Sequence, residues 1–157
     1  RVLENENDAI LVVVGPDDGY RKELEKIIEE LSIGNRVKFV DYISNVSEVY
    51  ADADVLVYPA IYEIFGLVPF EAIICGTPVI VTDDSGCGEI VKESDCGYLV
   101  RYGDVEDLKN QILYVLNNPD EAKKKVLQGQ KYIYNNLTWD KIVTKVEEVY
   151  ENCIRDV

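Results

Sequence analysis

The chain has 157 residues, of which 47% are hydrophobic, enough for one domain with a substantial core. Its net charge of −14 disfavours nucleic acid and anionic lipid as partners over most of the surface. Small anionic ligands stay possible, because backbone N–H groups at helix N-termini can hold phosphate. No apolar run reaches the roughly 18 residues of a membrane-spanning helix.

Three residue types narrow the chemistry further. His is absent, so no imidazole base can come from this chain. The four Cys have no C-x-x-C spacing, which predicts a reducing, cytoplasmic location and no metal site. Met is also absent and the first residue is Arg, so we expect a segment of a longer polypeptide.

Strands and helices alternate from the start of the chain. Residues 9–15, AILVVVG, form a continuous run rich in Val, which predicts a strand buried on both faces. A second strand is predicted over residues 36–40. Between them, apolar residues at helical spacing from Leu24 to Leu31 predict an amphipathic helix.

The alternation continues with strands predicted over residues 54–59, 77–82 and 97–100. Helices are predicted over about 46–53, 66–75 and 86–93, and Asp104 is a predicted N-cap for a further helix. Two last helices should begin near Pro119 and Thr138. We therefore predict one α/β domain over residues 1–157, a Rossmann-like doubly wound parallel sheet of about five strands with a helical C-terminal tail.

In such sheets, ligands bind beyond the carboxyl ends of the strands. Among the turns that follow the predicted strands, the one after residues 54–59 contains the most candidate binding residues. The N–H groups of Phe65, Gly66 and Leu67 would open the next helix and form an anion site. The alternative is an ordinary loop in which Gly66 serves only the backbone conformation.

Glu71 interrupts the almost wholly apolar run of that next helix, which predicts a helix hydrophobic all round and buried in the interior. One interpretation is a buried ion pair or a bond to backbone N–H groups. The other is an acceptor for ligand hydroxyls, since a carboxylate can take two donors side by side. Glu63, in the preceding loop, fits either a surface acid or a second ligand contact. Two carboxylates beside an anion-binding helix end suit a ligand that carries both hydroxyls and phosphate.

The D-x-D pair Asp52 and Asp54 is a candidate metal site of a different kind. It lies at the amino end of a predicted strand, opposite the ligand edge, so we interpret both residues as solvated acids.

Six stretches together resemble the retaining GT-B glycosyltransferases, the group that includes glycogen synthases and many mannosyltransferases. In EIFGLVPFEAIICGTPVIVT, seven residues separate Glu63 from Glu71, with Phe-Gly-Leu among them and a Gly-x-Pro-Val strand after them. VVVGPDDGYRKELE, NRVKFVDYIS, YADADVLVYPAIYE, SGCGEIV and TWDKIVTKVEEVY match further family segments in chain order. The resemblance covers nearly the whole chain.

The resemblance implies the C-terminal, donor-binding domain of a hexosyltransferase. The parent enzyme would move a sugar from a nucleotide diphosphate to a hydroxyl acceptor with retention of configuration, without metal or another cofactor. Glu63 would be the catalytic residue and contact the hydroxyls of the donor sugar, and Glu71 would contact the ribose. The other donor-binding positions implied are Gly15, Tyr42, Ile43, Ile64, Phe65, Gly66 and Leu67.

Other family features are missing from the chain. Family members begin this domain with a strand that carries an Arg and a Lys for the diphosphate, and an N-terminal domain binds the acceptor. We expect both upstream, together with any membrane association, and we predict that this segment alone is inactive. The alternatives are a nucleotide-sugar epimerase of the same fold and a non-catalytic binding or scaffold domain.

Overall fold

The computed structural model describes residues 1–155 of the chain. The chain divides into two compact units, Arg1–Val49 and Tyr50–Val157.

The first unit contains one parallel pair of strands. The strands β1 (Leu11–Val14) and β2 (Val37–Val40) pair from Leu11 with Val37 to Val14 with Val40. The helix α1 (Arg21–Glu30) connects them, and a short 3-10 turn at Gly34–Arg36 leads into β2. Another 3-10 turn, Val2–Glu4, precedes β1.

The prediction that β1 is buried on both faces is wrong for this unit. Leu11 is 57% exposed, and Val12 and Val14 are also exposed. The guanidinium of Arg21 lies 4.8 Å from the ring centroid of Phe39, so the start of α1 contacts one face of the pair. The unit has no second complete α-helix to cover the other face.

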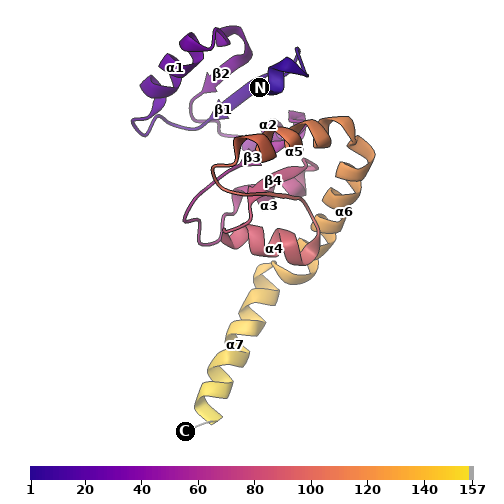
Figure 1. Cartoon of the computed structure of the whole chain (residues 1–157). Coiled ribbons are helices and arrows are strands. Elements are labelled where there is room, and N and C mark those ends of the chain that lie inside the picture. The colour runs from indigo at the N-terminus through magenta and orange to yellow at the C-terminus, as the bar shows by residue number, and fades with distance from the viewer. Residues whose placement is uncertain (156–157) are drawn as a thin grey trace. The chain divides into compact units, whose positions relative to one another are not determined.

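The second unit contains a three-stranded parallel sheet in the order β3-β4-β5, with helices between the strands (Figure 1). The predicted α/β class with parallel strands is confirmed, although the five strands form two sheets. The elements are α2 (Val46–Asp52, which begins in the first unit), β3 (Leu56–Tyr58), α3 (Val68–Cys75), β4 (Val79–Thr82), α4 (Gly86–Ser94), β5 (Tyr98–Val100), α5 (Val105–Asn117), α6 (Pro119–Asn136) and α7 (Trp139–Arg155).

Both faces of this sheet are covered, as a doubly wound fold requires. The strand β4 is fully buried, and its side chains alternate between two hydrophobic clusters. Val79 and Val81 pack with residues of α3, α4 and α6, whereas Ile80 packs with residues of β5, α5 and α6. The alternation places the core on both sides of one central strand.

The helix α3 begins at Val68, two residues later than its expected start at Gly66. Gly66 has φ +77°, a left-handed conformation that cannot belong to the helix, and Leu67 is the N-cap. The prediction that this helix is buried all round is also wrong. Phe70, Ala72 and Ile73 are buried against β3, β4 and α6, but Glu71 and Ile74 lie on the exposed side.

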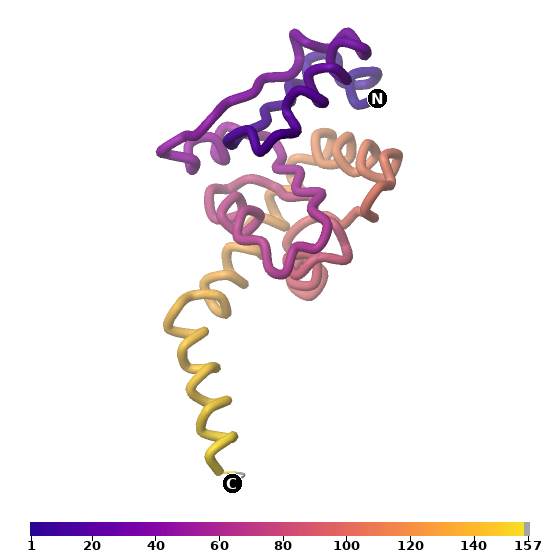
Figure 2. The backbone as a smooth tube through the Cα atoms, turned by 90° about the vertical axis from the view of Figure 1, so that its left-hand side faces the viewer, coloured from indigo at the N-terminus to yellow at the C-terminus, as the bar shows by residue number. Residues whose placement is uncertain are grey.

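The last helix, α7, extends away from the rest of the second unit, as Figure 2 shows. None of its residues is buried, and Trp139 at its start is 80% exposed. Among the helices of residues 1–155, none combines the length and the apolar character that crossing a bilayer requires.

The orientation of α3 predicts opposite outcomes for two neighbouring isoleucines. Ile73→Ala should lower the free energy of unfolding by about 2–5 kcal/mol, because it leaves a cavity beside Gly129 of α6. Ile74→Ala should cost less than about 1 kcal/mol, because Ile74 is 58% exposed. Chemical denaturation of the two variants measures the difference, and equal losses would contradict the orientation of α3.

Candidate functional site

The carboxyl ends of β3, β4 and β5 lie at one edge of the second unit's sheet, because the strands are parallel. The loop from β3 to α3, residues 59–67, is fixed to its neighbours at two points. The hydroxyl of Thr82 donates to the carbonyl oxygen of Ala60 at 2.6 Å. The N–H of Gly86, the first residue of α4, donates to the carbonyl oxygen of Glu63 at 3.0 Å. The backbone around Glu63 is therefore held by β4 and α4.

Both oxygens of the Glu63 carboxylate accept hydrogen bonds. Oε2 accepts from the hydroxyl of Tyr58 at 2.7 Å, and Oε1 accepts from the N–H of Phe65 at 3.3 Å. The Tyr58 bond, and then the N–H of Phe65, hold the pKa of Glu63 below its usual value. Glu63 is therefore a carboxylate at neutral pH.

The side chain of Glu71 meets a tyrosine as well. Its Oε2 accepts from the hydroxyl of Tyr50 at 3.1 Å. Of the two interpretations of Glu71, a buried ion pair is excluded, because the residue is exposed and forms no ion pair with any residue from 1 to 155. Its outward position leaves the rest of the carboxylate open to other donors.

The tyrosines themselves remain protonated. Burial, followed by the bond to Glu71, raises the pKa of Tyr50 to about 12. Burial, followed by the bond to Glu63, raises the pKa of Tyr58 to about 12 as well. Each phenol is thus a hydrogen-bond donor to its acid throughout the neutral range.

The residues that flank Glu63 face outward. Tyr62 has φ +60°, a left-handed conformation that costs a bulky residue about 1–2 kcal/mol. Tyr62 and Ile64 are at least 90% exposed, whereas Glu63 between them is half-buried. The loop therefore turns the acid inward and presents its neighbours to solvent, and strain of this kind gathers at functional sites.

Six of the predicted site residues lie in the second unit, and the other three lie in the first. The group in the second unit is Glu63, Ile64, Phe65, Gly66, Leu67 and Glu71. In the first unit, Gly15 follows β1 with φ +135°, and its N–H donates to the carbonyl oxygen of Val40 at 3.0 Å. Tyr42 is 82% exposed after β2, and Ile43 is half-buried beside it.

Tyr50 and Tyr58 are the site residues that the sequence analysis missed. Tyr50 belongs to the apolar pattern of α2 and Tyr58 ends an apolar strand, so neither residue was assigned a role at the site from the sequence. A signal was present nevertheless, because a tyrosine at a buried position has a hydroxyl that usually needs a partner.

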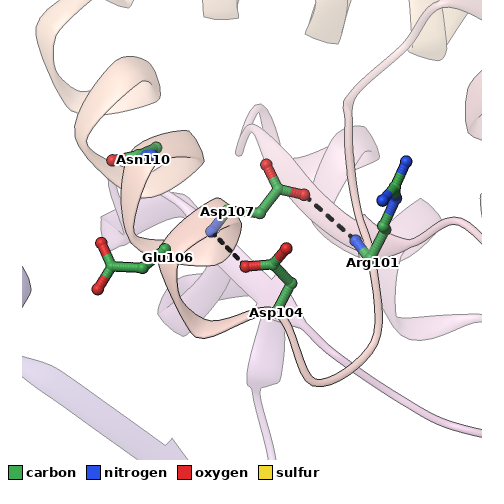
Figure 3. A pocket seen from close by; sticks show the side chains of 5 residues that line it. All are labelled: Arg101, Asp104, Glu106, Asp107 and Asn110. Carbon is green, nitrogen blue, oxygen red and sulfur yellow. Dashed lines mark hydrogen bonds between the residues drawn. The ribbon is translucent and has the colours of Figure 1, made fainter.

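A hollow of about 450 Å³ at the carboxyl edge lies beside the start of α5, away from Glu63 and Glu71, and is drawn in Figure 3. Two of its carboxylates are occupied by backbone N–H groups. Asp104 accepts from the N–H of Asp107 at 2.9 Å, which confirms the predicted N-cap, and Asp107 accepts from the N–H of Arg101 at 3.3 Å. With Glu106 also on its wall, the hollow is acidic and unsuited to a diphosphate.

Within residues 1–155, no three Cys, Asp or Glu side chains are grouped so that they could hold a metal ion. Asp52 ends α2 and Asp54 precedes β3, at the amino edge of the sheet.

Comparison with known proteins gives consistent matches. The family model described as glycosyl transferases group 1 matches residues 1–132. The chain is 31% identical to N-acetyl-alpha-D-glucosaminyl L-malate synthase of Bacillus anthracis over 98% of its own length and 40% of that protein.

Solved structures are similar to the chain over most of its length. A sucrose-phosphate synthase from Thermosynechococcus elongatus is 31% identical, with a TM-score of 0.80 over 94% of this chain and 39% of that one. The Anabaena HepE protein in complex with UDP-glucose is 25% identical, with a TM-score of 0.80 over 91% of this chain and 41% of that one. The chain thus spans about two fifths of the length of these proteins.

Gly86, at the start of α4, packs against the loop of residues 59–67, called the Glu63 loop from here on. Replacing Gly86 measures how closely this loop and α4 pack. A Cβ at this position would lie 1.8 Å from the carbonyl oxygen of Ile64, so the loop would have to move. We expect Gly86→Ala to lower the free energy of unfolding by about 3 kcal/mol and to displace the loop. Gly34→Ala is the matched control, since the nearest atom to its Cβ is 3.8 Å away. Thermal unfolding of both variants measures the effect, and an unchanged melting temperature for Gly86→Ala would refute the close approach.

Proposed function

The chain belongs to the group 1 glycosyltransferase family, and we propose that it binds the nucleotide-sugar donor of a retaining, GT-B-type hexosyltransferase. The observation that carries the proposal is the pair of carboxylates on the segment between β3 and the second turn of α3. Each has one oxygen bound by a tyrosine, and both lie at the edge of a parallel sheet where ligands bind. The HepE complex supports a nucleotide sugar as the ligand.

In this proposal, Glu63 accepts hydrogen bonds from hydroxyls of the donor sugar. As the bond between sugar and diphosphate breaks, positive charge develops on the sugar ring. A carboxylate whose pKa is held low stays negative during this step and stabilises that charge. Glu63 is the catalytic residue in this electrostatic sense, and no covalent bond to it is required.

Glu71 has the second role, on the nucleotide. The ribose of a nucleotide carries two neighbouring hydroxyls, and one carboxylate can accept from both. The exposed side of α3 leaves Glu71 accessible for this contact. The start of α3, with the N–H groups of Gly66 and Leu67, supplies the positive end of a helix dipole for the diphosphate.

The remaining parts of the proposal concern the whole protein. Gly15, Tyr42 and Ile43 would complete the donor site, with Tyr42 and Ile43 at the base. The acceptor would bind to a part of the polypeptide outside this chain, so the isolated segment should be inactive. Transfer would proceed without a metal ion, and the leaving diphosphate would take the proton of the acceptor.

The test is donor binding by the full-length protein. Calorimetry with UDP, GDP and ADP and with their glucose or mannose conjugates identifies the nucleotide. Glu71→Ala should weaken the free nucleotide and the nucleotide sugar alike, by about tenfold or more for the loss of a hydrogen-bonded carboxylate. Glu63→Ala should weaken only the nucleotide sugar.

Glu121→Ala is the matched control for these variants. Glu121 of α6 accepts from the hydroxyl of Tyr114 of α5 at 2.7 Å, so it repeats the tyrosine–glutamate pair outside the proposed site. Its replacement should leave both affinities unchanged. The proposal is wrong if no member of the panel binds, or if Glu63→Ala and Glu71→Ala both bind as the control does. Release of epimerised sugar without an acceptor would identify the epimerase alternative instead.

A further inference from the structure

We propose that Tyr58 and Tyr50 are positioning residues, each of which holds one of the two site carboxylates in the orientation that meets the donor. The inference rests on the proposed function and extends it to two side chains that need not touch the ligand themselves.

Tyr58, which donates a hydrogen bond to Glu63, lies on a strand. Tyr58 is the last residue of β3, and its backbone position is set by the pairing of Tyr58 with Val81 of β4. From this fixed point its hydroxyl reaches Oε2 of Glu63 at 2.7 Å. Because the N–H of Phe65 takes the other oxygen, the plane of the carboxylate is defined by two donors on separate elements of the chain.

Tyr50, which donates a hydrogen bond to Glu71, belongs to the hydrophobic core. Tyr50 is 9% exposed and belongs to the same hydrophobic cluster as Phe70 and Ile73 of α3. Its carbonyl oxygen accepts a hydrogen bond from the buried hydroxyl of Thr77, which ties the end of α2 to the segment before β4. The phenol is therefore held at both its backbone and its ring, and only its hydroxyl reaches the exposed carboxylate.

An uncharged hydrogen-bond donor such as a phenol is suited to orienting a carboxylate. A lysine or an arginine beside either acid would cancel its charge, whereas a phenol fixes the orientation and leaves the carboxylate negative. Each tyrosine also binds a single oxygen, Oε2, so that further acceptor positions stay available to ligand hydroxyls. Without the phenol, the acid side chain would sample several rotamers, and the donor would have to order it on binding.

The experiment uses Tyr58→Phe and Tyr50→Phe in the full-length protein, with UDP and UDP-glucose as probes, or the nucleotide that the panel above identifies. Tyr58→Phe should weaken UDP-glucose about five- to tenfold and leave UDP unchanged. Tyr50→Phe should weaken UDP and UDP-glucose by the same factor. Tyr114→Phe, which removes the equivalent hydroxyl from the Glu121 pair, should change neither affinity.

A double-mutant cycle separates positioning from a general structural role. If Tyr58 acts through Glu63, then Tyr58→Phe should have no further effect in a Glu63→Ala background, and the same holds for Tyr50 and Glu71. A loss of stability in Tyr50→Phe would appear in both backgrounds, so the cycle still decides if the melting temperature falls.

Two contrary results have different meanings. If the two glutamate variants lose affinity but the tyrosine variants do not, or if their effects simply add, the positioning role is wrong and the donor site stands. If the glutamate variants bind both probes as wild type does, the proposed function itself fails.

Discussion

The packing of α3 against β4 and α6 is the interaction on which the rest of the second unit depends. Ile73 is fully buried there, and a Cβ on Gly129 of α6 would lie only 2.8 Å from its side chain. At such a separation the helices can have one relative position, because a packed core has little free volume. The same helix carries Glu71 on its exposed side and follows the Glu63 loop, so the core determines where both acids lie.

This arrangement also explains how two negative charges are tolerated beside an apolar helix. Burying an unpaired carboxylate would be costly, and the fold avoids that cost by turning Glu71 outward. The apolar residues on the other side of α3 keep their contacts, and the hydroxyls of Tyr50 and Tyr58 reach the acids from the side of the core. The candidate site is therefore a polar rim on a hydrophobic support.

Much of the local structure was predictable, because it depends on neighbours in the sequence. Short apolar segments between helical patterns marked all five strands, and Asp104 was recognised as an N-cap from its place before a predicted helix. The exposure of β1 and the one-sided burial of α3 were not predictable, since an apolar run does not say how much cover the surrounding elements provide. The partners of Glu63 and Glu71 were missed for a related reason. Tyr58 and Tyr50 reach the acids through tertiary packing, and a tyrosine in an apolar pattern looks like any other core residue.

The solvent-exposed start of α7 has a practical consequence for spectroscopy. Trp139 is the single tryptophan of the chain, and it lies outside both hydrophobic clusters. An indole in water emits at long wavelength whether or not a distant core is intact, so the emission of Trp139 is a local reporter of α7. A shift of that emission to shorter wavelength would mean that another surface has covered the start of the helix, while the tyrosines beside Glu63 and Glu71 would remain invisible to it.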